Sequence, residues 1–244
     1  MASDVKGRSY DSPRRRAQAA ETRRAILDAA RRLFEEGGYA STPVPSIAAE
    51  ANVALKTVYL AFETKAGLLR AVWDARLGGE EEAMPVLDRS WFREVTAEAD
   101  PARKLRLVAA QSRRVKTSSG RLLEVIRTAA VTDPEIATLW RDIEAKLLGV
   151  QRAIVNQLGD AKSVARGLTR REATDVMWTL NHPTVWHLLV RERSWSPRRY
   201  ETWLYDAFCL HLLGPPAATP MTPTNSVGGH RTVSQNARQH RPSG

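Results

Sequence analysis

Residues 47–62 contain two short apolar patterns at helical spacing, separated by a residue suited to a tight turn. The first pattern consists of Ile47, Ala48 and Ala51, and the second of Val53, Val58 and Phe62. Asn52, between them, tolerates the left-handed backbone conformation that a tight turn between helices requires. Two short helices joined by such a turn, with the second packed on the first, form a helix-turn-helix. The sequence therefore predicts this motif near the N-terminus.

The second predicted helix has side chains suited to contact at its start and on its outer face. These residues are Leu55, Lys56, Thr57 and Tyr59. In a DNA major groove, lysine reaches guanine acceptors or a phosphate, threonine a base edge or a phosphate, and leucine a thymine methyl. The tyrosine hydroxyl suits a phosphate oxygen while its ring packs on the domain. A solvated lysine and a core tyrosine are the alternatives, but the group as a whole predicts DNA binding.

The residues around this motif resemble the N-terminal domain of TetR-type (tetracycline-repressor-like) transcriptional regulators, without a gap from about Thr22 to Ala75. The resemblance is carried by Phe34, Gly38, Tyr39, Thr42, Ile47, Ala48, Ala51, Asn52, Val53, Lys56, Thr57, Val58, Tyr59, Phe62, Lys65, Leu68 and Leu69. It implies phosphate contacts for Tyr59 and Lys65. It also implies repression as the usual mode of regulation.

Four positions depart from the usual pattern of that family. Asn52 stands where Gly is usual, Ala54 where Ser is frequent, Ala61 where Tyr or His is common, and Pro45 where a polar residue is common. Because Ala54 and Ala61 reduce the polar contact surface, the operator does not follow by analogy. We still expect Thr42 and Pro45, near the start of the helix before the turn, to belong to the DNA-contacting surface.

Positive charge is concentrated at the end of the chain that carries the motif. The net charge is +10, and residues 1–32 hold nine Lys or Arg side chains against four acidic ones. Arg14, Arg15 and Arg16 are therefore expected to follow the DNA backbone or to enter the minor groove. The alternative is a solubilising, disordered arm. The adjacent motif favours the DNA role.

Helix-start and helix-stop signals divide the chain into four predicted segments. We expect a disordered arm at 1–13, a homeodomain-like, three-helix DNA-binding domain at 14–77, a helical effector-binding and dimerisation domain at 78–213, and a disordered tail at 214–244. Helix starts are predicted at Asp100-Pro101, Asp133-Pro134, the Thr169–Glu172 capping box and Ser196-Pro197, with a break at Pro183. The sequence has no strand pattern, so the predicted fold class is all-α.

A single helix-turn-helix buries too little surface for tight, specific DNA binding, so a second copy is expected. The family resemblance implies a homodimer formed through the last two helices. This region is rich in aromatic residues, namely Trp178, Trp186, Trp195, Tyr200, Trp203, Tyr205 and Phe208. Such a cluster is most often plain core, although aromatic residues also concentrate in interfaces. We therefore expect a homodimer on a palindromic operator of double-stranded DNA.

The helices between Asp100 and Val190 are expected to form the effector domain, because in the family this region encloses a pocket for a small, often apolar molecule. Polar or amphipathic residues on otherwise apolar helices are candidate ligand contacts. They are Arg127, Trp140, Met177, Trp178, Asn181 and His182. Each could instead be a satisfied core or surface residue. The predicted effector releases the protein from its operator.

Patterns typical of enzymes are missing from the sequence. It contains no Gly-rich phosphate loop, Gly-x-Ser-x-Gly, His-Glu-x-x-His or paired-carboxylate pattern, so no enzymatic activity is expected. No cofactor is expected, and His182, His187 and His211 lack metal-ligand spacing. The alternatives that remain are an architectural DNA-binding protein and a small-molecule-binding helical protein or enzyme.

The expected compartment follows from the single cysteine and from the lack of long apolar runs. Cys209 excludes an internal disulfide and fits a reducing environment. No run is long enough to span a membrane, and the N-terminus lacks the apolar segment of a signal peptide. We therefore expect a cytoplasmic protein without a membrane partner.

Overall fold

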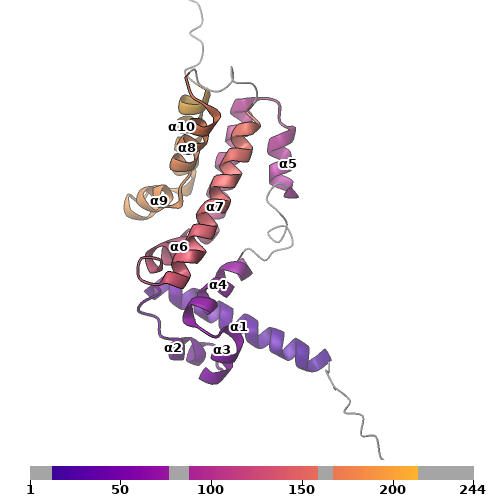
Figure 1. The fold of residues 1–244 in the computed structure, drawn as a ribbon, viewed down its shortest axis with the longest axis vertical. Helices are drawn as coiled ribbons and strands as arrows, with labels where there is room; N and C mark the ends of the chain where they lie inside the picture. Colours follow the sequence, from indigo (N-terminus) through magenta and orange to yellow (C-terminus); the bar gives the residue numbers. More distant parts are fainter. Residues whose placement is uncertain (1–12, 77–87, 159–166, 214–244) are drawn as a thin grey trace, which may run out of the picture.

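The computed structural model describes residues 13–76, 88–158 and 167–213. Every regular element within these ranges is a helix. Figure 1 shows helices α1–α4 gathered at one end of the molecule and α5–α10 at the other. The predicted all-α fold class is confirmed.

Four helices form the N-terminal part of the molecule. They are α1 (Pro13–Gly37), α2 (Val44–Glu50), α3 (Leu55–Phe62) and α4 (Lys65–Arg76). α1 is followed by Gly38, whose φ of 81° lies in a region that favours glycine. The core between these helices is built from the buried side chains Ile26, Phe34, Ile47, Val58, Leu68 and Leu69.

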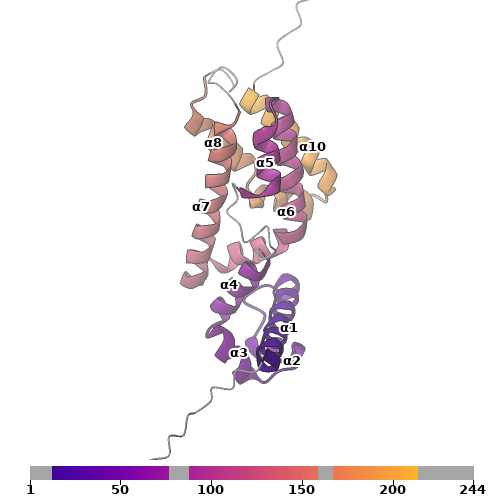
Figure 2. The same ribbon diagram turned by 90° about the vertical axis from the view of Figure 1, so that its right-hand side faces the viewer.

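The remaining helices form the body of the molecule. They are α5 (Ser90–Ala97), α6 (Pro101–Ala129), α7 (Pro134–Asn156), α8 (Arg170–Leu180), α9 (Pro183–Trp186) and α10 (Pro197–Phe208). The π-helical segments η2 (His187–Glu192) and η3 (Cys209–Leu213) extend α9 and α10. In Figure 2, α6 and α7 run along the body with α5 beside α6. α10 packs on α6, and α8 packs on α7.

The predicted helix starts in the body are confirmed by their caps. Asp100, Asp133 and Ser196 each accept hydrogen bonds from backbone amides in the first turn of the helix that follows. Thr169 and Glu172 form the predicted capping box. The break at Pro183 is also present, because His182 has an extended ψ of 142° and caps α9. Local sequence signals therefore set these boundaries.

A continuous hydrophobic core joins the N-terminal helices to the base of the body. Trp73 and Leu69 of α4 belong to the same buried cluster as Ile126 of α6 and Ile136 and Ile143 of α7. A second cluster fills the upper body between α5, α6, α8 and α10. α4 thus packs on both α6 and α7.

Several predicted segments lie outside the described residues. Residues 1–12 of the predicted arm, the expected boundary between 77 and 78, and the tail 214–244 are among them. Pro13, expected to end the arm, already belongs to α1. The predicted domain boundaries therefore stay predictions.

Candidate nucleic-acid interface and internal cavity

The turn between α2 and α3 has the backbone conformation that the sequence predicts. Asn52 has a φ of 54°, in the left-handed region. The Val53 amide donates to the Ala48 carbonyl over 3.0 Å, which closes the turn. Ala54, the N-cap residue just before α3, has an extended ψ of 141°, and its side chain forms no capping hydrogen bond. Backbone geometry alone thus sets how α3 leaves the turn.

α3 buries one face and exposes the other. Val58 and Phe62 are buried in the N-terminal core. The predicted contact residues on the outer face are Leu55, Lys56 and Tyr59, with Thr57 half-buried beside them. Leu55 is 39% exposed and Tyr59 46%, which is high for side chains of this size. An outer face that combines an ammonium, a phenol and an apolar branch fits contacts in a DNA groove.

The two predicted contact positions near the start of α2 differ from each other. Pro45 is exposed in the first turn. Thr42 is buried, and its hydroxyl is within hydrogen-bond distance of the carbonyl oxygens of Leu33 at 3.1 Å and Gly38 at 2.8 Å. The hydroxyl predicted to meet phosphate is therefore used inside the domain, where it braces the end of α1. This corrects the expectation for the Thr42 side chain.

Lys65 lies at the start of α4 and faces the segment between α1 and α2. Its Nζ is 3.5 Å from the Ala40 carbonyl oxygen and 4.4 Å from the centre of the Tyr39 ring. Burial lowers the pKa of Lys65, and the nearby Asp133 carboxylate opposes that effect. Its predicted phosphate contact stays a prediction.

Tyr39 ties this corner of the N-terminal part to the body. The Tyr39 hydroxyl donates to Oδ2 of Asp133 over 2.8 Å, and Asp133 caps α7. Burial, together with the hydrogen bond to Asp133, raises the pKa of Tyr39. The neighbouring Thr64 hydroxyl donates to Oε2 of Glu135, in the first turn of α7, over 3.3 Å. The start of α7 is thus hydrogen-bonded to two neighbours of Lys65: Tyr39, whose ring Lys65 contacts, and Thr64, which precedes Lys65 in the chain.

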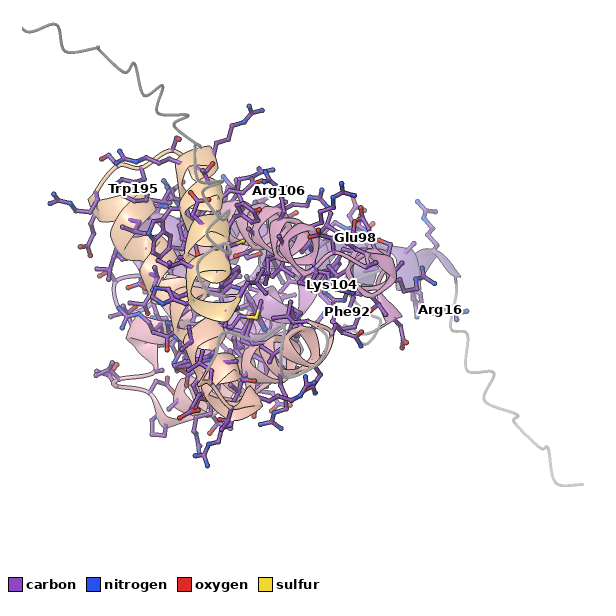
Figure 3. The ribbon with its side chains drawn as sticks, turned by 90° about the horizontal axis from the view of Figure 1, so that it is seen from above. Arg16, Phe92, Glu98, Lys104, Arg106 and Trp195 are labelled. Atoms are coloured by element: carbon purple, nitrogen blue, oxygen red, sulfur yellow. The ribbon has the colours of Figure 1, made fainter. Side chains whose placement is uncertain are left out.

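The basic residues of α1 extend the candidate interface. Arg14, Arg15 and Arg16 are exposed on the first turns of α1, and Figure 3 shows Arg16 far from Trp195 of the body. Arg23 donates to the Ala61 carbonyl over 3.3 Å, so it ties α1 to the end of α3. The DNA contacts expected of the first three arginines stay predictions.

Three of the six predicted ligand contacts form one cluster. The His182 ring centre lies 6.1 Å from that of Trp140 and 4.8 Å from that of Trp178. His182 Nδ1 accepts the Thr184 amide over 3.2 Å, and its Nε2 is 3.6 Å from Oε1 of Glu144. Burial lowers the pKa of His182, and Glu144 acts in the opposite direction. His182 therefore caps α9, which is a structural role.

The other three predicted ligand contacts have separate side-chain surroundings, although the Asn181 amide donates to the Met177 carbonyl at the end of α8. Arg127 forms a two-pronged hydrogen bond with Glu124 on the same helix, at 2.9 and 2.6 Å. Met177 is fully buried in the upper core. Asn181 is the one member of the predicted set that lines the cavity between the body helices. The sequence hypothesis thus identified one wall residue of that cavity and missed the others.

A cavity of about 200 Å³, here called the α5–α7 cavity, lies between α5, α6 and α7. Its apolar wall includes Trp91, Val108, Ile143, Leu147, Val150 and Ile154. Trp73 of α4 also lines it, so the cavity reaches the helix that begins at Lys65. A mostly apolar cavity with a few polar groups is typical of sites for small molecules.

The polar wall residues missed from the sequence include Ser112 and Lys116 of α6 and Gln151 of α7. A signal for two of them was present in the sequence. Lys104, Val108, Ser112 and Lys116 recur every four residues, which places them on one stripe of α6. Because three of these four residues are polar, the stripe resembles a solvent-exposed helix face, and the pattern did not indicate a buried site.

A second hollow, of about 310 Å³, lies where α1 meets α6 and η2. Both acidic and basic side chains line it, among them Glu35, Glu124, Arg121 and Arg191. Because such groups can neutralise one another across the hollow, it fits a small apolar effector less well than the α5–α7 cavity does.

Within residues 13–76, 88–158 and 167–213, no three His, Cys, Asp or Glu side chains lie together in a way that could hold a metal ion. Over the same part of the chain, no helix has both the length and the apolar character needed to cross a bilayer.

Comparison with known proteins identifies the N-terminal part. Residues 26–72 match the family described as bacterial regulatory proteins, tetR family. The chain is 40% identical over 57 residues to the HTH-type transcriptional regulator AcrR of Shigella flexneri. That match covers 23% of this chain and 26% of the relative, so it concerns about a quarter of each protein.

Solved structures extend the similarity of fold to the body. The FadR regulator of Bacillus subtilis, solved with stearoyl-CoA, has a TM-score of 0.61 and 21% identity, over 79% of this chain and 99% of that one. NalD of Pseudomonas aeruginosa, named as the secondary repressor of a multidrug efflux pump, has a TM-score of 0.61 and 21% identity, over 80% and 98%. At this level of identity, these likenesses concern the fold.

Proposed function

We propose that this protein, whose N-terminal domain is that of the tetR family of bacterial regulatory proteins, is a transcriptional repressor released from a palindromic operator by a small-molecule effector. The observation that carries the proposal is the course of α4. This helix begins with Lys65, three residues after the end of α3, and reaches the wall of the α5–α7 cavity with Trp73. One rigid element therefore connects the candidate interface with the candidate effector site.

On the DNA side, the exposed face of α3 enters the major groove. Lys56 and Leu55 contact base edges, and Tyr59 contacts a phosphate. Lys65 and the exposed arginines at the start of α1 add phosphate contacts, which give a strong dependence of affinity on salt. Asn52 supports this orientation, because its left-handed conformation sets the direction in which α3 leaves the turn.

Two copies of the chain bind one operator. Two-fold symmetry in the protein is matched by two half-sites in the DNA, with recognition helices about 34–36 Å apart or more. The proposed dimer surface is formed by α8, α10 and η3. Support comes from Leu210 of η3, which is 59% exposed, and from Trp203, which is half-buried on α10.

Effector binding changes the spacing of the two recognition helices through α4. The cavity touches α4 at Trp73. At the opposite end of α4, Lys65 contacts the ring of Tyr39, whose hydroxyl donates to Asp133, the cap of α7. The effector has to prefer the form that does not bind DNA. A tenfold loss of DNA affinity needs about 1.4 kcal/mol of differential binding.

Two similar proteins lend support to this reading. NalD is named as a repressor, and the FadR structure contains a long acyl thioester. A repressor that releases DNA when an apolar ligand fills its body therefore agrees with the names of structures that share this fold.

The decisive experiment has two parts. DNA fragments that bind the full-length protein are selected from a random pool, and the best ones are footprinted. A short protected palindrome is expected. Compounds that change the intrinsic tryptophan fluorescence of the protein are then added to the complex, and a fall in DNA affinity is expected.

The alternative function is that of an architectural DNA-binding protein. It would protect no discrete palindrome, and its affinity would hardly vary between sequences. If ligands bind the body without changing DNA affinity, the proposed DNA-binding role still holds, but release by an effector is contradicted.

A further inference from the structure

We propose that the α5–α7 cavity binds a small apolar carboxylate whose anionic group lies against Lys116. The inference rests on the proposed role of this cavity as the effector site, and it names the chemical class of the effector. It follows from the charge, the contacts and the size of the cavity wall.

Lys116 is a buried cation that opens onto the cavity. It is only 5% exposed, yet it lines the cavity together with Ser112 and Asn181. Its Nζ lies within hydrogen-bond distance of four oxygens: Ser112 Oγ at 3.0 Å, the Asn181 carbonyl and side-chain oxygens at 2.7 and 2.6 Å, and the Tyr200 hydroxyl at 2.8 Å. All four partners are neutral oxygens. The ammonium is thus solvated by dipoles and lacks a carboxylate partner among the described residues.

This arrangement is unfavourable for a charged lysine. Removing an ammonium from water is strongly unfavourable unless an opposite charge compensates for it. Burial accordingly lowers the pKa of Lys116 well below its usual value. A carboxylate within hydrogen-bond distance would supply the missing charge and favour the protonated form.

Four oxygens surround an ammonium that has only three hydrogens, so one of them can be replaced. Asn181 and Ser112 lie on the cavity side, whereas Tyr200 does not line the cavity. A ligand carboxylate can therefore take the place of one neutral oxygen without leaving a lysine hydrogen unpaired. The exchange replaces a hydrogen bond to a neutral oxygen by one to a carboxylate, in which both partners are charged and the attraction is stronger.

The other charged residues of the wall have the same sign. Besides Lys116, they are Arg89 and Lys146, and no acidic side chain lines the cavity within the described ranges. Cations surrounding a mostly apolar space attract an anion and repel a cationic ligand. The wall therefore selects by charge.

Two polar atoms of the wall also lack partners. Gln151 is only 4% exposed, and its Oε1 accepts no hydrogen bond from the described residues. The indole N–H of Trp91 is likewise buried and unpaired there. Because buried polar groups are normally satisfied, these atoms indicate an occupant with polar groups rather than a pure hydrocarbon.

The size of the cavity limits the apolar part. An apolar protein cavity of about 150 Å³ accepts a benzene ring. The α5–α7 cavity, at about 200 Å³, therefore has room for one ring or a short alkyl chain together with a carboxyl group. Trp73 and Trp91 provide aromatic surface for such a group.

The test compares ligands that differ only in charge. Two carboxylates, 3-phenylpropionate and octanoate, are titrated into the full-length protein without DNA by isothermal calorimetry. Their primary amides and the corresponding amines serve as neutral and cationic counterparts. At least one carboxylate should bind about tenfold or more tightly than its amide, and the amines should bind more weakly still.

Lys116→Met retains the length of the side chain but removes its charge. It should abolish the preference for carboxylate over amide, while amide binding changes little. Lys104→Met is the matched control. Lys104 is another buried lysine of α6, but it donates to the Val95 and Thr96 carbonyls of α5 and does not line the cavity. This control should keep the full carboxylate preference.

Several results would overturn the inference. They are equal binding of carboxylates and amides, tighter binding of amines, no saturable binding of either carboxylate, or an unchanged preference in Lys116→Met. The comparison of ligands on the unaltered protein decides the matter even if that variant does not fold. The calorimetry contains no DNA, so it tests the ligand class separately from release of the operator. If a carboxylate binds as expected but does not change operator affinity in the DNA-binding experiment, effector release is contradicted and the ligand class still holds.

Discussion

At the residue scale, Asn52 determines the geometry of the recognition element. Its φ of 54° is costly for most side chains because Cβ approaches the backbone. Asparagine tolerates this region better than alanine, and glycine adopts it freely. The position therefore links a local backbone preference to the orientation of the exposed face of α3, which we propose contacts DNA.

Asn52→Ala should lower the free energy of unfolding by about 1 kcal/mol, whereas Asn52→Gly should stay within about 0.5 kcal/mol of the original protein. Urea denaturation of the full-length chain, followed by circular dichroism, measures both. If the alanine variant were as stable as the glycine variant, the left-handed conformation would not constrain this turn.

The exposed side chains of α3 allow a second prediction at this scale. Lys56→Ala and Tyr59→Phe should each weaken operator binding, and loss of a phosphate contact should reduce the slope of log affinity against log salt by about one. Fluorescence anisotropy on the selected operator measures both quantities. Arg152→Ala, which removes an exposed charge from α7, is the control and should behave like the original protein. Unchanged affinity in both α3 variants would mean that another face binds DNA.

At the scale of elements, the close approach of α6 and α9 depends on Gly120. A Cβ at this position would lie 2.9 Å from the indole nitrogen of Trp186, which is buried against α6. Gly149 of α7 is a contrast, because a Cβ there would meet no atom within 4 Å. An added methyl group would therefore clash at Gly120 but would meet open space at Gly149.

Alanine at these two positions should change stability in opposite directions. Gly149→Ala should stabilise the protein by about 0.5–1 kcal/mol, since alanine favours the helical conformation. Gly120→Ala gains the same helix preference but forces Trp186 to move. Its free energy of unfolding is therefore expected to fall by about 1–2 kcal/mol. Thermal and urea unfolding of both variants provide the comparison. Stabilisation by both would show that the packing of α9 on α6 adapts easily.

At the scale of the whole molecule, we propose that operator binding depends on two copies of the chain. Leu210 of η3 is 59% exposed at the end of the proposed dimer surface. Val131, in the turn after α6, is 81% exposed near the N-terminal helices. A charge at either position should be tolerated by the folded monomer, because neither residue is part of a core.

Leu210→Glu should therefore shift the protein from dimer towards monomer and weaken operator binding by about tenfold or more, because a charge would be buried in the interface. Val131→Glu should remain a dimer of unchanged DNA affinity. Light scattering coupled to size-exclusion chromatography measures the masses. A dimer that persists in Leu210→Glu would place the interface elsewhere, and a monomer in the unaltered protein would contradict the homodimer.

The sequence alone determined the features that depend on neighbouring residues. The left-handed turn at Asn52, the capping box at Thr169 and the break at Pro183 all follow from backbone preferences and hydrogen bonds within a few positions. The exposed face of α3 also follows, because the spacing of Val58 and Phe62 fixes which side of a short helix is buried. Such signals are read without knowledge of how helices pack.

Only the tertiary structure decided how distant residues meet. Lys116 contacts Asn181 and Tyr200, which lie 65 and 84 positions away in the chain. Thr42, predicted to face phosphate, is buried because α1 ends against it. These placements depend on the angles and distances at which long helices pack, and many distant side chains set these together. Helical periodicity predicts which residues face inward, but the packing of α5, α6 and α7 decides whether that interior is filled or forms a cavity.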